Sequence, residues 1–367
     1  MKIYVITPNY TIAGVPLAQL RFARALLNKG FQVELIVGNV PEPYQIPYVE
    51  GLEITVLDKG HARKMLFPLM KFFKLKKPKL VFSAEDHLNV IVLLAAMISR
   101  SDAKISCSSR VTPFDTYSDK FFSKRWFLKQ AAKIVFPRAD VLSCVSIDMV
   151  TQYNSIFKNL NHIPIYNVIK DDLSIERMQE DASHKWLNNP DQNILIAAGR
   201  LAPWKGFDSL IKAMPDVLNK KNVKLIILGD GPMKDELDDL IKKLNLQNTV
   251  DLPGYVNNPL SFYAKADIFV LSSLVEGLPN VLVEAMMCGC TPVATNCPTG
   301  PMEVLHGGKY GYLVPVNNQK AMSEAIVEAL DNPIPKYLLD EAVEPFTVDN
   351  VVEQHFSALN LKKELSK

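Results

Sequence analysis

The segment KIYVITPNYTIAGVPLAQLRFARALLNKGFQVELIV, residues 2–37, carries the pattern from which the fold class follows. Residues 2–7 form a short apolar run that ends in polar residues, which predicts a strand. Apolar side chains recur at near-helical spacing over residues 15–28, and Gly30 stands where a helix C-cap is expected. A second strand is predicted over residues 31–37. Together they form a βαβ unit, and fully apolar strands indicate a parallel sheet covered on both faces.

The same pattern recurs in the C-terminal half of the chain. Strands are predicted over 193–198, 223–228, 267–272 and 291–294, and helices over 206–218, 233–244, 279–287 and 347–361. A polar, irregular segment, residues 170–191, separates the two halves. We therefore expect an α/β protein with two Rossmann-like domains, residues 1–170 and 190–346.

The composition suits a two-domain globular protein. Of the 367 residues, 48% are hydrophobic and 22% charged, which supports two cores and excludes disorder as the main state. A net charge of +2 argues against a protein that coats nucleic acid, and no recognition motif is present. Five scattered cysteines make no disulfide framework. The N-terminus lacks a signal-peptide apolar run, and the longest apolar stretch, residues 90–98, is too short to span a bilayer. We expect a cytoplasmic protein.

Two basic stretches in the N-terminal half, residues 59–79 and 120–138, contain no acidic residue and interleave lysine and arginine with aromatic side chains. A basic amphipathic helix with aromatic residues suits contact with an anionic membrane surface. A helix of the first-domain core would explain residues 59–79 equally well. We expect both stretches to face the membrane, and keep the core-helix alternative open for the first of them.

The segment SSLVEGLPNVLVEAM, residues 272–286, predicts a phosphate site. A loop with Glu276 and Gly277 follows a strand, and Pro279 is expected at the first helical position. Three free N–H groups would then point out of the helix N-terminus, those of Leu278, Asn280 and Val281. Glu276 precedes the helix and Glu284 lies on it. Carboxylates beside phosphate are electrostatically costly unless they bind hydroxyl groups, which a ribose and a sugar supply.

The segment GRLAPWKG, residues 199–206, places two cations in the same half of the chain. Arg200 and Lys205 fall in the loop at the carboxyl end of a strand, where open α/β sheets bind ligands. They would neutralise a diphosphate without a metal. No Walker-type loop, GxSxG elbow, HExxH or Asp-x-Asp motif occurs, which argues against several other enzyme classes and against a metal–diphosphate site.

These segments together resemble the retaining glycosyltransferases of the GT-B fold, family 4. Residues 276–284 match that family's E-x7-E motif, and its other motifs follow in the usual order at residues 199–206, 229–232, 254–256 and 297–303. The resemblance covers residues 193–316, and the first half of the chain resembles the family only in pattern. It implies two Rossmann-like domains whose parallel sheets face each other across a cleft. It also implies that the final helix, within residues 347–367, packs back on the first domain.

The resemblance implies a role for each matching residue. Arg200 and Lys205 would bind the donor diphosphate and stabilise the leaving group. Glu276 would hold hydroxyls of the donor sugar, and Glu284 those of the ribose. The remaining donor contacts would come from Gly14, Gly229, Gly231, Tyr255, Val256, Gly277, Leu278, Pro279, Asn280 and Val281. The donor base would sit against residues 229–232 and 254–256, largely through main-chain contacts.

In the first domain, many members of the family carry an active-site histidine where this chain has Arg110. Arginine cannot act as a base at neutral pH, so we expect Arg110 to contact phosphate or the acceptor. His87, together with Asn89 in the segment EDHLN, is the rival candidate for this role, and a purely structural role for His87 is the alternative.

We therefore expect a metal-independent retaining transferase without a cofactor. It would move a hexose or N-acetylhexosamine from a nucleoside-diphosphate donor, UDP-linked by analogy, to a growing cell-surface or polyprenyl-diphosphate-linked glycan at the inner membrane face, like bacterial members that build capsule, O-antigen or lipid-linked oligosaccharides. A GT-B nucleotide-sugar 2-epimerase and a non-catalytic nucleotide-sugar-binding protein are the alternatives. The E-x7-E motif and the basic stretches argue against the first. The presence of Arg200, Lys205 and Glu276 argues against the second.

Overall fold

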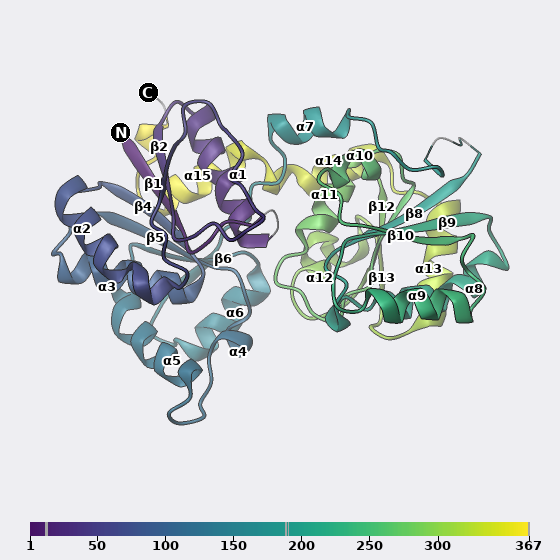
Figure 1. The fold of residues 1–367 in the computed structure, drawn as a ribbon, viewed down its shortest axis with the longest axis horizontal. Helices are drawn as coiled ribbons and strands as arrows, with labels where there is room; N and C mark the ends of the chain where they lie inside the picture. The colour runs from purple at the N-terminus through teal and green to yellow at the C-terminus, as the bar shows by residue number, and fades with distance from the viewer. Residues whose placement is uncertain (12–13, 188, 190, 366–367) are drawn as a thin grey trace. The chain divides into compact units, whose positions relative to one another are not determined.

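Two α/β units make up the part of the chain that the structure, a computed structural model, describes: residues 1–11, 14–187, 189 and 191–365 (Figure 1). Unit 1 consists of the described residues up to Val168 and from Phe346 onward, and unit 2 consists of those of Ile169–Pro345. Each unit is built on one sheet of parallel strands. This confirms the predicted α/β class with two Rossmann-like units. Residues 366–367 of the predicted C-terminal segment lie outside the described residues.

In unit 1 the strands lie in the order β3-β2-β1-β4-β5-β6-β7. They are β1 (Lys2–Thr7), β2 (Gln32–Val37), β3 (Glu53–Val56), β4 (Leu80–Ala84), β5 (Lys104–Ser109), β6 (Val141–Cys144) and β7 (His162–Pro164). The α-helices are α1 (Gly14–Asn28), α2 (Leu66–Lys76), α3 (Asp86–Ile98), α4 (Pro113–Thr116), α5 (Lys124–Val135), α6 (Ile147–Ile156) and α15 (Val348–Ala358). The strand order reverses beside β1, because β2 and β3 lie on one side of it and β4 on the other.

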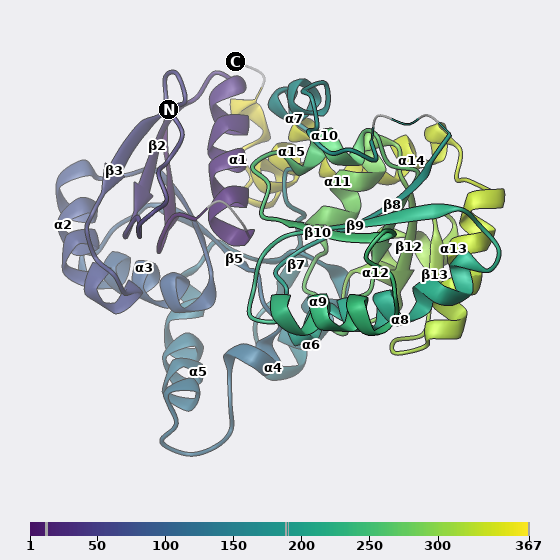
Figure 2. The same cartoon turned by 45° about the vertical axis from the view of Figure 1, so that its right-hand side comes forward.

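The sheet of unit 1 is covered on both faces, as its apolar strands predicted. Helix α1 ends in a Schellman turn, in which Gly30 has φ +83° and its N–H donates to the Leu27 carbonyl at 2.8 Å. Helices α1 and α15 pack on one face, where Phe31 stacks on Phe356 with ring centroids 5.1 Å apart (Figure 2). Helices α2 and α3 lie on the other face, where Tyr4 of β1 meets Phe72 of α2 edge-on. The C-terminal helix α15 is therefore part of the unit 1 core.

In unit 2 the strands lie in the order β10-β9-β8-β11-β12-β13. They are β8 (Asn193–Ala198), β9 (Val223–Leu228), β10 (Val250–Gly254), β11 (Ile268–Leu271), β12 (Thr291–Thr295) and β13 (Tyr312–Val314). The α-helices are α7 (Asp172–Met178), α8 (Phe207–Leu218), α9 (Lys234–Lys243), α10 (Pro259–Tyr263), α11 (Asn280–Cys288), α12 (Pro301–Val304), α13 (Gln319–Asp331) and α14 (Lys336–Val343).

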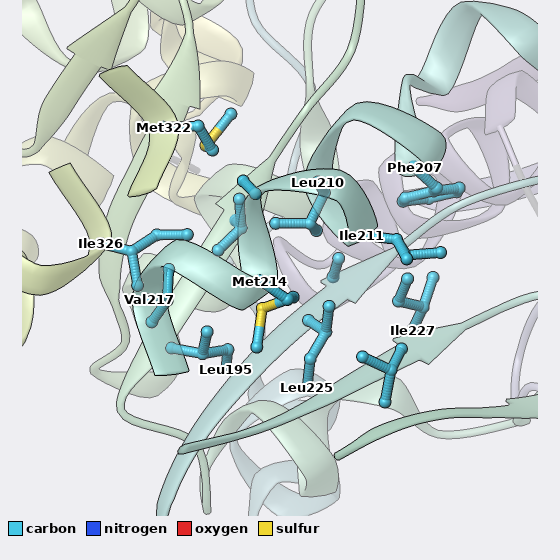
Figure 3. Packing of buried hydrophobic residues seen from close by; sticks show 14 of the residues in the cluster. Leu195, Phe207, Leu210, Ile211, Met214, Val217, Leu225, Ile227, Met322 and Ile326 are labelled. Atoms are coloured by element: carbon cyan, nitrogen blue, oxygen red, sulfur yellow. The ribbon is translucent and has the colours of Figure 1, made fainter. Parts of the chain in front are cut away.

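The core of unit 2 follows from strict alternation along its strands. Leu195 of β8 points to the face covered by α8, α9 and α13, where Met214 and Ile326 close over it (Figure 3). On the opposite face, Phe269 of β11 meets Tyr263 of α10 edge-on at 5.3 Å. This double cover holds the strand ends, and hence the loops that leave them, in fixed positions.

Two local predictions differ from the structure. The segment predicted to be irregular, residues 170–191, contains helix α7, because Asp171 and Ser174 form a reciprocal capping box that starts a helix. The prediction that Pro279 is the first helical residue is wrong, since Pro279 takes the N-cap and α11 begins at Asn280.

Candidate functional site

The loops that follow β8 and β11 meet where the strand order of unit 2 reverses. From the central strand β8 the chain passes to β9 on one side and later to β11 on the other. Ligands of open α/β sheets bind at the carboxyl ends of the strands at such a point. Arg200 and Lys205 follow β8, and Glu276 and Gly277 follow β11. Unit 2 thus brings the predicted cations and carboxylate to one edge of one sheet.

Lys205 and Glu276 form an ion pair, although 71 residues separate them in the sequence. The Nζ of Lys205 lies 2.5 Å from Oε1 of Glu276. The Ser273 hydroxyl donates to the same Oε1 at 2.6 Å. Only 17% of the Lys205 side chain and 11% of the Glu276 side chain are exposed, so solvent screens the pair weakly. The site therefore presents a cation and a carboxylate side by side, with Arg200 exposed on the same loop as Lys205.

Backbone contacts hold the β8 loop against the β11 loop. Gly206 has φ +62°, and a Cβ on it would lie 2.2 Å from the Ser272 carbonyl oxygen. The Ser272 hydroxyl donates to the Lys205 carbonyl at 2.8 Å, and the Leu274 N–H donates to the Trp204 carbonyl at 2.8 Å. Only glycine permits this approach, and it fixes the backbone on which Lys205 is carried.

The glycines of the β9 loop serve a similar purpose. A Cβ on Gly229 would lie 1.9 Å from the Gly199 carbonyl oxygen, and one on Gly231 would lie 2.4 Å from the Leu201 carbonyl oxygen. The Leu201 N–H donates to the Asp230 carbonyl at 2.9 Å. The β9 loop therefore packs directly on the backbone that flanks Arg200.

The next loop along the sheet edge contacts the same region. The N–H of Gly229 donates to the Gly254 carbonyl at 2.9 Å, which joins the β9 loop to the end of β10. Tyr255 follows with half of its surface exposed, and Val256 is half-buried. The segments predicted to contact the donor base thus adjoin the loop after β8, which carries Arg200 and Lys205.

A third loop fixes Glu276 from behind. The Glu276 N–H donates to the Pro298 carbonyl at 3.3 Å, and the Thr299 hydroxyl donates to the Glu276 carbonyl. Gly300 has φ +94°, and a Cβ there would meet Cδ of Pro279 at 2.5 Å. The loop after β12 therefore positions both Glu276 and the entrance to α11.

The start of α11 differs in part from the predicted anion site. The Asn280 N–H donates to the Leu278 carbonyl at 2.9 Å, so it is not one of the free donors that the sequence predicted. The N–H groups of Leu278 and Val281 have no acceptor among the described residues. Glu284, on the first turns of α11, is buried with 6% of its surface exposed.

Four of the predicted site residues belong to unit 1. Gly14 is the first residue of α1 and is exposed, with φ +65°. His87 pairs with Glu85, with 3.0 Å between Nε2 and Oε2, and this hydrogen bond raises the pKa of His87. Asn89 is buried and donates to the Ser108 carbonyl at 3.0 Å, which ties α3 to β5. Arg110 directly follows β5.

Sequence reasoning missed Ser273 and Thr299, whose hydroxyls contact Glu276. Ser273 lies three residues before Glu276, a spacing that a hydroxyl bond to a loop carboxylate allows. Thr299 had no such local signal, since its partner is 23 residues away.

The described residues hold neither a cluster of metal ligands nor a membrane-spanning helix. No three His, Cys, Asp or Glu side chains gather in the arrangement that a bound metal ion would need. No helix there combines the length and apolar character needed to cross a bilayer.

Comparison with known proteins connects this geometry to a family. The model of the family described as glycosyl transferases group 1 matches residues 178–342. An uncharacterized glycosyltransferase of Methanocaldococcus jannaschii is 33% identical over 276 residues, which cover 68% of this chain and 66% of the relative.

A second relative covers more of the chain. The Campylobacter jejuni enzyme named N-acetylgalactosamine-N,N'-diacetylbacillosaminyl-diphospho-undecaprenol 4-alpha-N-acetylgalactosaminyltransferase is 30% identical over 320 residues, 84% of each chain. Among solved structures, HepE of Anabaena in complex with UDP superposes with a TM-score of 0.69 at 19% identity, covering 100% of this chain and 98% of that one. Such structural relatives confirm the predicted GT-B fold class. The chain belongs to the group 1 glycosyltransferases.

Proposed function

We propose that the chain is a retaining, metal-independent glycosyltransferase that moves a hexose or N-acetylhexosamine from a UDP-linked donor to a lipid-linked or cell-surface glycan. The Lys205–Glu276 pair at the reversal point of unit 2 carries this proposal, because it sets a cation for phosphate beside a carboxylate for sugar hydroxyls. The name of the Campylobacter relative, which describes a diphospho-undecaprenol substrate, supports the acceptor class. The UDP complex of HepE supports the donor class.

The charges divide the work between the residues of the site. Breaking the bond between sugar and phosphate leaves negative charge on the diphosphate, which Lys205 and Arg200 would stabilise. Glu276 would accept hydrogen bonds from the donor sugar, while Lys205 neutralises the charge of the Glu276 carboxylate. We assign Glu276 no nucleophilic role, because its carboxylate is held by Lys205 and Ser273. Glu284 would accept hydrogen bonds from the ribose hydroxyls.

Nucleotide binding tests the donor site directly. We expect UDP to bind the full chain with micromolar affinity in the presence of EDTA, and Glu284→Gln to weaken it by about tenfold or more, because a charged acceptor is lost from the ribose. Calorimetric titration with UDP, GDP and ADP measures both the affinity and the choice of base. Glu236→Gln, at an exposed position on α9, is the matched control. Folded protein that binds none of the three nucleotides, or needs a divalent ion to do so, would contradict the proposal.

Donor turnover separates the transferase from its alternatives. Cleavage of a UDP-sugar should accelerate when a polyprenyl-diphosphate-linked glycan is added, and the anomeric configuration should be retained in the product. An epimerase would ignore the lipid, and a binding protein would turn nothing over.

We also propose that unit 1 contacts the anionic inner face of the cell membrane through the segment leading into α5. There Phe121, Phe122 and Phe127 are 72%, 78% and 53% exposed and pack around Trp126, with exposed Lys120 and Lys124 nearby. These residues, 120–127, form the aromatic–basic surface, which lies at the end of unit 1 away from its sheet (Figures 1 and 2). Exposed aromatics beside cations suit the interface of an anionic bilayer.

The other basic stretch, residues 59–79, has a mixed environment. Helix α2 buries Leu69 and Phe73 in unit 1, as the core-helix interpretation predicted. Phe67 and Leu75 remain 76% and 71% exposed. We therefore propose a secondary membrane contact for α2.

Vesicle co-sedimentation tests the membrane contact. Phe121→Ser with Phe122→Ser should weaken binding to vesicles that contain anionic lipid by about tenfold or more, because two large apolar side chains leave the interface. Phe67→Ser should have a smaller effect. Tyr337→Ser replaces an equally exposed aromatic residue on α14 and should have none. Equal sedimentation of all the variants would overturn the assignment.

A further inference from the structure

The guanidinium of Arg110 in unit 1 has hydrogen-bond donors without acceptors. Its Nε and Nη1 are shielded from solvent, and neither has a hydrogen-bond partner among the described residues. These atoms carry three of the five N–H groups of the side chain. The residue as a whole is partly exposed, through atoms other than these two. Burial lowers the pKa of Arg110 to about 10, which leaves it charged at neutral pH. A buried cation with unmet donors is costly unless something binds there.

The backbone on both sides of Arg110 is held by one buried carboxyl group. Asp86, at the start of α3, accepts hydrogen bonds from the hydroxyls of Ser109 and Tyr153 at 2.6 Å each. The Tyr153 hydroxyl also lies 3.0 Å from the Val111 carbonyl. The neighbours of Arg110 on each side are therefore fixed to the same cluster. The backbone that carries Arg110 is therefore pre-positioned, which reduces the entropy lost when a ligand binds.

Arg110 also follows a strand that lies one position away from the reversal point of the unit 1 sheet. It follows β5, next to β4, and β4 pairs with β1, where the strand order turns back. Glu85, the first residue after β4, has φ +78°, a conformation that a non-glycine residue seldom keeps without a functional or packing reason. The strained backbone of Glu85 and the unpaired donors of Arg110 thus lie at the carboxyl edge of the sheet, where open α/β sheets bind ligands.

The charged and titratable groups around Arg110 do not cancel its positive charge, so it can bind an anion. The groups that act on it are Glu85, whose carboxylate is shared with His87, and His355 of α15. Burial, with the charge of Arg110, lowers the pKa of His355 to about 3, so His355 is neutral at physiological pH. His87 offsets the charge of the Glu85 carboxylate when the imidazole is protonated.

We propose that Arg110 binds the phosphate oxygens of a phosphoester or diphosphate group of a substrate, in a subsite formed by residues of unit 1. The planar fork of N–H groups matches phosphate, and charge-assisted hydrogen bonds to it are strong. The identity of the substrate rests on the proposed function, since either the donor or a polyprenyl-diphosphate acceptor carries such a group. The existence of the anion subsite does not depend on it.

Sodium pyrophosphate is the first probe, used in an Arg200→Gln background so that unit 2 contributes less binding. Arg110→Gln should bind pyrophosphate on the order of 10- to 100-fold more weakly than its parent, and Arg110→Lys should fall between them. Arg100→Gln is the matched control, because Arg100 is exposed and lies beyond the C-terminus of the 13-residue helix α3. Asp86, which holds the neighbours of Arg110, lies at the N-terminus of the same helix. Without ligand, Arg110→Gln should unfold at the parent's temperature or above, because an unsatisfied cation has been removed.

The outcomes separate a ligand site from a structural arginine. Lower thermal stability of ligand-free Arg110→Gln, or failure of this variant to fold, would show that the guanidinium supports the fold and would overturn the proposal. Pyrophosphate binding equal to that of Arg100→Gln, or absent from the parent, would also overturn it. UDP and farnesyl diphosphate then identify the source: weaker binding of UDP by Arg110→Gln assigns the donor, and weaker binding of farnesyl diphosphate assigns the acceptor. Loss of UDP binding in Glu284→Gln tests the donor site independently.

Discussion

Replacing Lys205 with glutamine is expected to lower kcat by roughly 100- to 1000-fold with a much smaller change in KM. The reason is that charge develops on the diphosphate only as the bond to the sugar breaks, so the cation does most of its work in the transition state. Steady-state kinetics with a UDP-sugar and a lipid-linked acceptor measure the two constants separately. A raised KM with unchanged kcat would mean that Lys205 contributes only to ground-state binding.

The same variant should lose stability through its ion pair. The Glu276 side chain is 11% exposed in the intact pair, and without Lys205 its Oε1 keeps the Ser273 hydroxyl as a hydrogen-bond partner. Because the pair is partly screened, we expect a cost of about 2 kcal/mol, below that of a fully buried pair. The double variant Lys205→Gln with Glu276→Gln should recover part of this loss, although its activity should stay low.

Lys212 provides the matched control for the ion pair. It forms an i,i+4 pair with Asp208 on α8 at 2.7 Å, and 46% of its side chain is exposed. Lys212→Gln should change the free energy of unfolding by no more than about 0.5 kcal/mol and leave kcat unchanged. If Lys205→Gln behaved like Lys212→Gln in both respects, the assignment of the cation would be wrong.

The strands and helices that carry the site could be predicted because their signals are local. β1, β8 and β9 begin and end where the apolar runs indicated, and Gly30 caps α1 as expected. Helix α7 was missed because its capping box, Asp171 with Ser174, lies in a segment too polar for apolar periodicity to reveal a helix.

The site residues could be predicted individually, but their contacts could not. Lys205 and Glu276 each stood out as a loop residue, whereas their pairing depends on β8 and β11 being neighbours in the sheet. The reversal of strand order that brings them together leaves no mark in either segment. The same holds for Arg110, whose surroundings come from β4, α3 and α15.

The glycines of unit 2 illustrate the difference between a motif and its cause. Gly229 and Gly231 were predicted as places where backbone could contact the donor base. In the structure, their Cβ positions are filled by the backbone of residues 199–201. The loop that carries Arg200 and Lys205 can therefore assemble only if these two positions have no side chain. Replacing either glycine should reduce stability as well as donor binding.

Gly229→Ala is accordingly expected to destabilise unit 2 by about 3–5 kcal/mol. A Cβ there would lie 1.9 Å from the Gly199 carbonyl oxygen, so backbone must move, and its φ of +136° adds strain for any L-residue. Gly231→Ala separates the cost of steric overlap from the cost of backbone strain. It has the overlap alone, 2.4 Å from the Leu201 carbonyl oxygen, and we expect about 2–3 kcal/mol.

Gly254→Ala is the control for conformational strain alone. Gly254 has φ +91° with no atom within 4 Å of its Cβ position, so its cost should be about 1–2 kcal/mol. Urea unfolding followed by tryptophan fluorescence, in a Trp126→Phe background, reports on unit 2 only, because Trp186 and Trp204 both belong to it. The loss of UDP affinity should follow the same order. It should be largest for Gly229→Ala, smaller for Gly231→Ala and smallest for Gly254→Ala. A cost at Gly254 as large as that at Gly229, with little or no cost at Gly231, would mean that these glycines relieve backbone strain and do not serve the packing of the β9 loop on the Arg200 loop.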